Sequence, residues 1–149
     1  MANEQNKGCS GSFDLSRFVR AQAGVYERAL GELRDGFKTS HWMWFIFPQM
    51  RGLGLSETSR LYSISGREEA LAFLHHDLLG QRFVECTEAM INWGDRRRAV
   101  DILGPIDTLK FRSSMTLFDA VASEQYRFGQ ALDLFFDGER DPATLQLLD

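Results

Sequence analysis

The 149-residue sequence predicts one all-α domain, and three observations lead to that prediction. Apolar residues recur at steps of three and four along most of the chain, which is the spacing of one helix face. Short polar or glycine-containing breaks separate these stretches, as in compact helical domains. The one continuous apolar run has no strand-like partner, and an unpaired strand would leave its backbone groups without hydrogen bonds. We predict a single compact multi-helix domain with short connections over residues 13–149, preceded by a disordered Gly-, Ser- and Asn-containing tail over residues 1–12.

The domain is predicted to begin with one long helix. Asp14 can cap a helix whose apolar stripe runs from Leu15 to Leu33, and Gly36 is placed to end it in the left-handed conformation. The apolar run over residues 42–47 comes next. Because it has no strand to pair with, we expect a short helix followed by an irregular loop.

Capping residues mark the helices that follow. Ser56 can cap a short helix, and Ser65 with Glu68 has the spacing of a capping box for a helix over residues 67–75. The remaining periodic stretches are bounded by Gly, Pro or Asp. They predict helices over residues 78–93, 99–103, 107–122, 125–136 and 143–148.

Composition and charge exclude several functional classes. Lys and Arg number 17 against 21 Asp and Glu, a net charge of −4, whereas nucleic-acid binders usually carry a basic excess. No apolar run approaches the roughly 20 residues of a membrane helix, and no signal-like leader opens the chain. The two cysteines form no CxxC motif, and neither a P-loop nor a metal-binding motif is present. We expect a cytoplasmic protein that uses no metal and no cofactor and binds neither nucleic acid nor membrane.

One candidate site lies in residues 38–49, KTSHWMWFIFPQ, where hydrogen-bonding side chains stand among large aromatic ones. Ligand pockets are often apolar with a few convergent polar groups. Trp42 and Trp44 could stack on a planar ligand, and His41 could transfer a proton near neutral pH. A structural interpretation places the tryptophans in the core and makes His41 a helix cap. The candidate ligand-binding residues of this segment are Lys38, Ser40, Trp42, Trp44 and Gln49, of which the last could fix an amide or a base edge.

A second candidate site lies in residues 107–116, DTLKFRSSMT. On a helix, Asp107, Lys110 and Ser114 share one face, and Ser113 flanks it. Lys110 could bind an anion or lower the pKa of a hydroxyl, and Asp107 could orient it or activate water. The structural alternative is a surface ion pair with serines bonded to the preceding turn. The candidate catalytic residues of both segments are His41, Asp107 and Lys110, and the ligand-binding candidates here are Ser113 and Ser114.

Several segments, taken in order, resemble a known family. They are Phe18 through Gln22, Lys38 to Gln49, Gly52-Leu53-Gly54, Glu69-Ala70, Leu79 to Arg82, and Asp107-x-x-Lys110-x-x-Ser113 through Phe118. Together they resemble the bacterial family catalogued as domain of unknown function 1810, from about Phe13 to Leu148. The resemblance implies a mainly helical fold and brings no accepted catalytic residues. The family is often labelled calpastatin, but calpastatin repeats resemble disordered, proline-rich segments, and this chain has 3 prolines and 44% hydrophobic residues.

Two functional hypotheses follow from these residues. The leading one is that a pocket built from both segments binds or processes a small planar, polar or anionic ligand, nucleotide- or ADP-ribose-like. An N-glycosidic or ADP-ribosyl hydrolase would fit, with Asp107 as the carboxylate. The alternative is a protein-interaction module without catalysis, using an exposed patch of Trp42, Trp44 and Phe47. Burial of the three aromatic rings discriminates between the two hypotheses, because an interaction surface requires these rings to be exposed.

Overall fold

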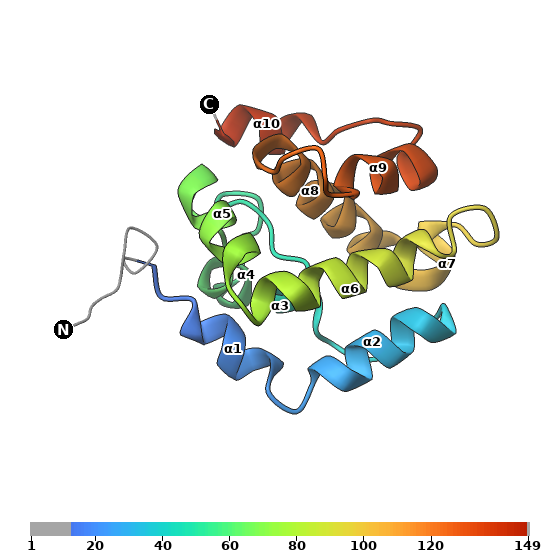
Figure 1. The fold of residues 1–149 in the computed structure, drawn as a ribbon, viewed down its shortest axis with the longest axis horizontal. Helices are drawn as coiled ribbons and strands as arrows, with labels where there is room; N and C mark the ends of the chain where they lie inside the picture. Colours follow the sequence, from blue (N-terminus) through green and yellow to red (C-terminus); the bar gives the residue numbers. More distant parts are fainter. Residues whose placement is uncertain (1–12, 149) are drawn as a thin grey trace.

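The computed structural model of the protein describes residues 13–148, so the predicted tail over residues 1–12 lies outside the described residues. Residues 13–148 form ten helices and no strand, which confirms the all-α prediction (Figure 1). None of these helices is long and apolar enough to cross a membrane. The helices are α1 (Ser16–Gln22), α2 (Tyr26–Asp35), α3 (Met43–Ile46), α4 (Glu57–Leu61), α5 (Arg67–His75), α6 (Leu79–Ile91), α7 (Ala99–Leu103), α8 (Pro105–Val121), α9 (Phe128–Phe136) and α10 (Pro142–Leu148).

The predicted first helix is wrong as one continuous element, because it is broken between α1 and α2. Gly24 has a φ of 75°, a left-handed conformation that turns the chain where the helix was expected to continue. The apolar spacing persists through the break because both halves face the interior. They face different neighbours there: α1 packs against α3, and α2 packs along α6. Gly36 ends α2 with a φ of 76°, as predicted.

The start of α5 corrects the predicted capping box. The helix has the predicted bounds, but its N-cap is Gly66, which has no side chain to accept a hydrogen bond. Glu69, one residue after the expected Glu68, accepts a 2.8 Å hydrogen bond from the backbone N–H of Ser65. Glu69 is buried and also forms a 3.0 Å ion pair with Arg17 of α1. A tertiary partner therefore selects which glutamate turns back toward the helix start.

The core is centred on α6 and α8, and phenylalanine rings fill it. Figure 1 shows α6 crossing the middle of the molecule, between α2 on one side and α8 and α9 on the other. The rings of Phe83 and Phe118 from these two helices lie 4.4 Å apart, centre to centre. Phe47, which follows α3, is fully buried and contacts Phe83 at 5.9 Å and Phe111 at 5.0 Å. Burial of this ring anchors the end of α3, and with it the segment that carries the first candidate site.

Candidate functional site

The two candidate segments meet in the folded chain. The Lys38 Nζ lies 2.9 Å from Oδ2 of Asp107, and the other oxygen of that carboxylate lies 3.7 Å from the Lys110 Nζ. The backbone joins the same two regions, because the N–H of Lys38 donates a 2.8 Å hydrogen bond to the carbonyl of Ile102 in α7. Residues from the first segment and from the start of α8 are thus held side by side.

A surface cleft of about 310 Å³ opens where these segments meet. The chain leaves α7 at Gly104, whose φ is 86°, and Pro105 begins α8 at a position where its missing N–H is not needed. This sharp turn forms one wall of the cleft, and the start of α3 forms the other. The lining residues are Lys38, His41, Met43, Trp44, Leu103, Gly104, Pro105, Ile106 and Asp107.

The charges beside this cleft do not balance. Lys38, Asp107 and Lys110 form a trio with two ammonium groups and one carboxylate, and their side chains are 8%, 19% and 23% exposed. Each ammonium group also lies over an indole ring, Lys38 at 4.9 Å from Trp42 and Lys110 at 4.8 Å from Trp44. Contact with the electron-rich face of an aromatic ring stabilises a cation. The trio therefore holds one excess positive charge in a largely desolvated position.

The polar groups of Ser40 and Trp42 face away from the cleft, toward Glu32 of α2. The Glu32 carboxylate accepts hydrogen bonds from the Ser40 hydroxyl at 2.6 Å and from the Trp42 indole N–H at 2.9 Å. It accepts three more from the hydroxyl and backbone N–H of Thr39 and the backbone N–H of Ser40. Burial by itself raises the pKa of Glu32, but these hydrogen bonds outweigh it and lower the pKa to about 2. Trp42 is fully buried and does not line the cleft, so the structure places its ring in the core.

Ser113 and Ser114 lie away from the cleft. Ser113 donates a 2.8 Å hydrogen bond to Asp141, which also accepts one from Thr144 at the start of α10. Burial raises the pKa of Asp141, but the hydrogen bonds from Thr144 and Ser113 outweigh it, so the pKa is lowered overall. Ser114 is fully buried, and its hydroxyl has no partner within residues 13–148. Neither serine lines the cleft, because their side of α8 packs against the rest of the molecule.

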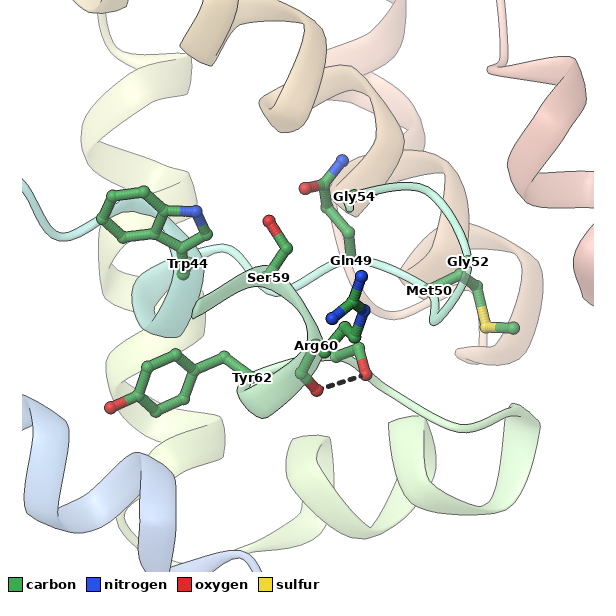
Figure 2. Close-up of a pocket in the computed structure, with 9 residues that line it drawn as sticks. Trp44, Gln49, Met50, Gly52, Gly54, Ser59, Arg60 and Tyr62 are labelled. Atoms are coloured by element: carbon green, nitrogen blue, oxygen red, sulfur yellow. Dashed lines mark hydrogen bonds between the residues drawn. The ribbon is translucent and has the colours of Figure 1, made fainter. Parts of the chain in front are cut away.

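Gln49 lies at a second, smaller hollow, of which Trp44 is also a wall (Figure 2). This hollow has a volume of about 20 Å³. The loop that carries Gln49 is fixed by two 2.8 Å backbone hydrogen bonds with Ile64, one from the N–H of Arg51 and one to the carbonyl of Gln49. The hollow is lined by Trp44, Gln49, Met50, Gly52, Gly54, Ser59, Arg60, Tyr62 and Ser63.

The exposed aromatic patch of the alternative hypothesis is absent from the described surface. Trp42 and Phe47 have no exposed area, and Trp44 is half-buried. The exposed apolar side chains beside the cleft are aliphatic instead, Ile106 at 70% and Leu109 at 64%. Two of the three aromatic rings on which the interaction module was predicted therefore lie in the core.

The buried cysteine thiol and the metal-ligating side chain types offer no second reactive centre within residues 13–148. The thiol of Cys86 is buried in α6, and burial raises its pKa to about 12, which keeps it from acting as a nucleophile at neutral pH. Within residues 13–148, no group of three or more His, Cys, Asp or Glu side chains is placed to hold a metal ion. The cleft beside the lysine trio combines charged side chains with access from the surface. A larger pocket, of about 700 Å³, lies between the start of α1 and α5 and includes Asp14, Glu68, His75 and His76 in its lining.

The sequence reasoning missed Glu32, the residue that orders the first segment. It lies in α2, where it belongs to no recognisable motif, and its only signal is an acidic side chain shortly before a run of hydrogen-bond donors. It also missed the small hollow, because Ser59 and Arg60 come from α4 and meet Gln49 only in the folded chain.

Comparison with known proteins gives a family and a fold. The family model described as "Protein of unknown function (DUF1810)" matches residues 12–148. A solved structure, the conserved hypothetical protein Rv1873 from Mycobacterium tuberculosis, has a TM-score of 0.89 and 48% sequence identity. The match covers 92% of this chain and 97% of that chain. No curated protein matches the sequence significantly.

Proposed function

The chain belongs to the DUF1810 family of proteins of unknown function, and from its site we propose that it binds a small, planar, anionic ligand in the cleft between α3 and the α7–α8 turn. The observation that carries this proposal is the lysine trio. Lys38 and Lys110 share the single carboxylate of Asp107, which leaves one positive charge without a protein counter-ion in the trio. An anionic group such as a phosphate or carboxylate would complete the charge balance.

Lys38 lines the cleft, and Lys110, which lies beside it, is the more exposed of the two lysines. Lys38 is 8% exposed, lies close to Asp107 and donates a 2.6 Å hydrogen bond to the carbonyl of Ser40. Lys110 lies 3.7 Å from Asp107 and 4.8 Å from the centre of the Trp44 ring and is 23% exposed, so its ammonium group is the more accessible of the two to an incoming anion. We assign Lys38 to holding Asp107 in place and Lys110 to contacting the ligand.

The walls of the cleft favour a ligand with a flat apolar face. Trp44 is half-buried, and Met43, Pro105 and Ile106 supply the other apolar surface. A volume of about 310 Å³ lies at the small end of the range for ligand pockets, about 300–1,000 Å³. A nucleotide combines a planar ring with an anionic group at this scale, and it is the class of ligand we propose.

The geometry supports binding more directly than hydrolysis. Both oxygens of Asp107 are taken up by ammonium groups, which disfavours this carboxylate as the base that activates water. His41 is exposed at the cleft and carries the one imidazole among its lining residues. Any reaction on the bound ligand would therefore use His41.

Calorimetric titration of the protein with adenosine, adenosine monophosphate and inorganic phosphate tests the proposal. We expect the monophosphate to bind at least tenfold more tightly than adenosine, because it alone places both a ring and a charge. Lys110→Met should weaken the monophosphate tenfold or more. Arg28→Met, an equal charge loss on the exposed face of α2, should leave it unchanged. Absence of binding, or equal binding by both variants, contradicts the proposed site.

A further inference from the structure

We propose that the pocket between the start of α1 and α5 binds a small organic cation with an apolar body, such as a protonated aromatic amine. Its volume of about 700 Å³ lies within the range of about 300–1,000 Å³ that ligand pockets span. None of its lining residues lines the cleft beside the lysine trio. Figure 1 shows α5 and the start of α1 at the opposite end of the molecule from α7, which borders that cleft. The pocket is therefore a second site, and the proposal does not rest on the proposed function.

One face of α5 forms a wall of this pocket. Its lining residues follow one another at the spacing that places side chains on the same side of a helix, and they are Glu68, Leu71, Ala72 and His75. Leu71 is half-buried, Ala72 is 7% exposed, and the half-buried ring of Phe13 adds apolar lining before α1. Glu68 stands at one end of this apolar stretch and His75 at the other. The wall thus offers apolar surface to the body of a ligand and a carboxylate to one end of it.

The two walls of the pocket are fixed to each other before any ligand binds. Arg17 of α1 forms a 3.0 Å ion pair with Glu69 of α5, and the two side chains are only 14% and 4% exposed. Phe18 of α1 packs edge-on against Phe73 of α5, with 5.0 Å between the ring centres. A preformed pocket favours binding, because no wall has to be ordered when the ligand enters.

His76 contributes a hydrogen-bond donor in a defined tautomer. Its Nδ1 accepts 3.1 Å hydrogen bonds from the backbone N–H groups of Leu78 and Leu79 at the start of α6, so the ring proton is on Nε2. Within the part of the chain that the structure describes, no acceptor takes a hydrogen bond from this Nε2–H. A hydroxyl or carbonyl oxygen on the ligand could accept it. Because Nδ1 is in use as an acceptor, His76 adds no positive charge that would oppose a cation.

The charge of the pocket lining is negative. Asp14 and Glu68 both line the pocket, and no lysine or arginine does. The hydrogen bond from the Ser16 hydroxyl lowers the pKa of Asp14, so this carboxylate is ionised at neutral pH, and the nearby guanidinium groups of Arg20 and Arg17 offset part of its charge. Glu68 forms no ion pair with any residue that the structure describes. We therefore assign the Glu68 carboxylate to the cationic group of the ligand.

Three small probes that share an aromatic body and differ in charge test the proposal: phenethylamine, 2-phenylethanol and phenylacetate. Nuclear magnetic resonance titration of the isotope-labelled full chain at pH 8 reports both their affinity and their location. We expect the amine to bind about fivefold more tightly than the alcohol, and phenylacetate to bind most weakly, because a partly exposed ion pair contributes about this factor. The backbone signals of residues 71–76 should shift. Glu68→Gln should reduce the preference for the amine to about twofold or less, and Glu27→Gln, an equal charge change on the exposed side of α2, should leave it unchanged.

Four outcomes of this titration would overturn the proposal. Equal binding of the three probes, or absence of binding by the amine at millimolar concentration, removes the cation site. A preference for the amine that persists in the folded double variant Asp14→Asn with Glu68→Gln removes the role of the carboxylates. Shifts confined to Trp44 and residues 103–107 would place the amine in the cleft instead. Binding of adenosine monophosphate should be the same in Glu68→Gln as in the wild type, so failure of one proposal leaves the other standing.

Discussion

Two carboxylates hold the segment from Lys38 to Trp44, and they do so in opposite ways. Glu32, on the α2 side, accepts five hydrogen bonds from uncharged donors of Thr39, Ser40 and Trp42. Asp107, on the α8 side, faces two ammonium groups. In the region around Glu32 the polar groups are hydrogen-bonded to one another, whereas the region around Asp107 has one more positive charge than negative charge.

This difference separates structure from function within one short segment. Polar clusters whose members are matched to one another stabilise a fold, whereas departures from such matching are expected at binding sites. We therefore propose that Ser40 and Trp42 order the segment and that Trp44 and Lys110 serve the ligand. The predictions below test this division, from the largest expected effect to the smallest.

Removing the acceptor at the centre of the first region should have the largest effect on stability. Glu32→Ala leaves the indole N–H of the fully buried Trp42 without a partner, together with the donors of Ser40. We expect the free energy of unfolding to fall by about 2–4 kcal/mol in urea denaturation. Glu27→Ala, exposed in the first turn of the same helix, should change it by less than about 0.5 kcal/mol. Similar losses in the two variants would contradict the central role of Glu32.

Acid should reduce the stability that the Glu32 carboxylate contributes, over the pH range between its pKa values in the unfolded and folded protein. The pKa of Glu32 is about 2 in the folded protein against an ordinary 4.5, so its carboxylate stabilises the fold fully above pH 4.5. That contribution is lost as the pH falls from 4.5 toward 2. The stability difference between the wild type and Glu32→Gln should therefore shrink across this range in denaturation curves. A difference that stays constant between pH 6 and 2 would show that the carboxylate is not the stabilising group.

The two lysines of the trio should differ in their contribution to stability. Lys38→Met removes a largely buried ion pair and the hydrogen bond to Ser40, and we expect a loss of about 1–3 kcal/mol. Lys110→Met removes a longer and more exposed contact, and we expect less than about 1 kcal/mol. Thermal and urea denaturation of both variants checks the order. The reverse order would make Lys110 the structural lysine and contradict its assignment to the ligand.

Of these substitutions, replacement of His41 should change the stability of the fold least. It is exposed at the cleft, so His41→Gln should change the free energy of unfolding by no more than about 0.5 kcal/mol. Any turnover of a bound nucleotide should nevertheless be lost in this variant, because His41 is the imidazole that lines the cleft and both oxygens of Asp107 face ammonium groups. A melting temperature several degrees below the wild type would instead identify His41 as a structural residue.

The local chemistry of the sequence determined the helical fold and the positions at which several helices begin and end. Apolar spacing identified helices such as residues 67–75 and 99–103, which are α5 and α7. Ser56 caps α4 and Gly36 ends α2, as predicted, because capping and left-handed termination depend on residues a few positions apart. Both candidate segments were also visible in the sequence as polar residues within aromatic and apolar surroundings.

Only the tertiary structure decided how these residues are used. The break at Gly24 leaves the apolar spacing intact, so periodicity cannot reveal it, and packing of the two halves on different helices produces it. Trp42 and Trp44 look alike in the sequence, but they differ in the fold. Trp42 is buried and donates a hydrogen bond to Glu32, whereas Trp44 is half-buried and lies under the ammonium group of Lys110. The pairing of Lys38 with Asp107 joins residues far apart in the chain. Such long-range contacts depend on how whole helices pack, which no local pattern of residue types encodes.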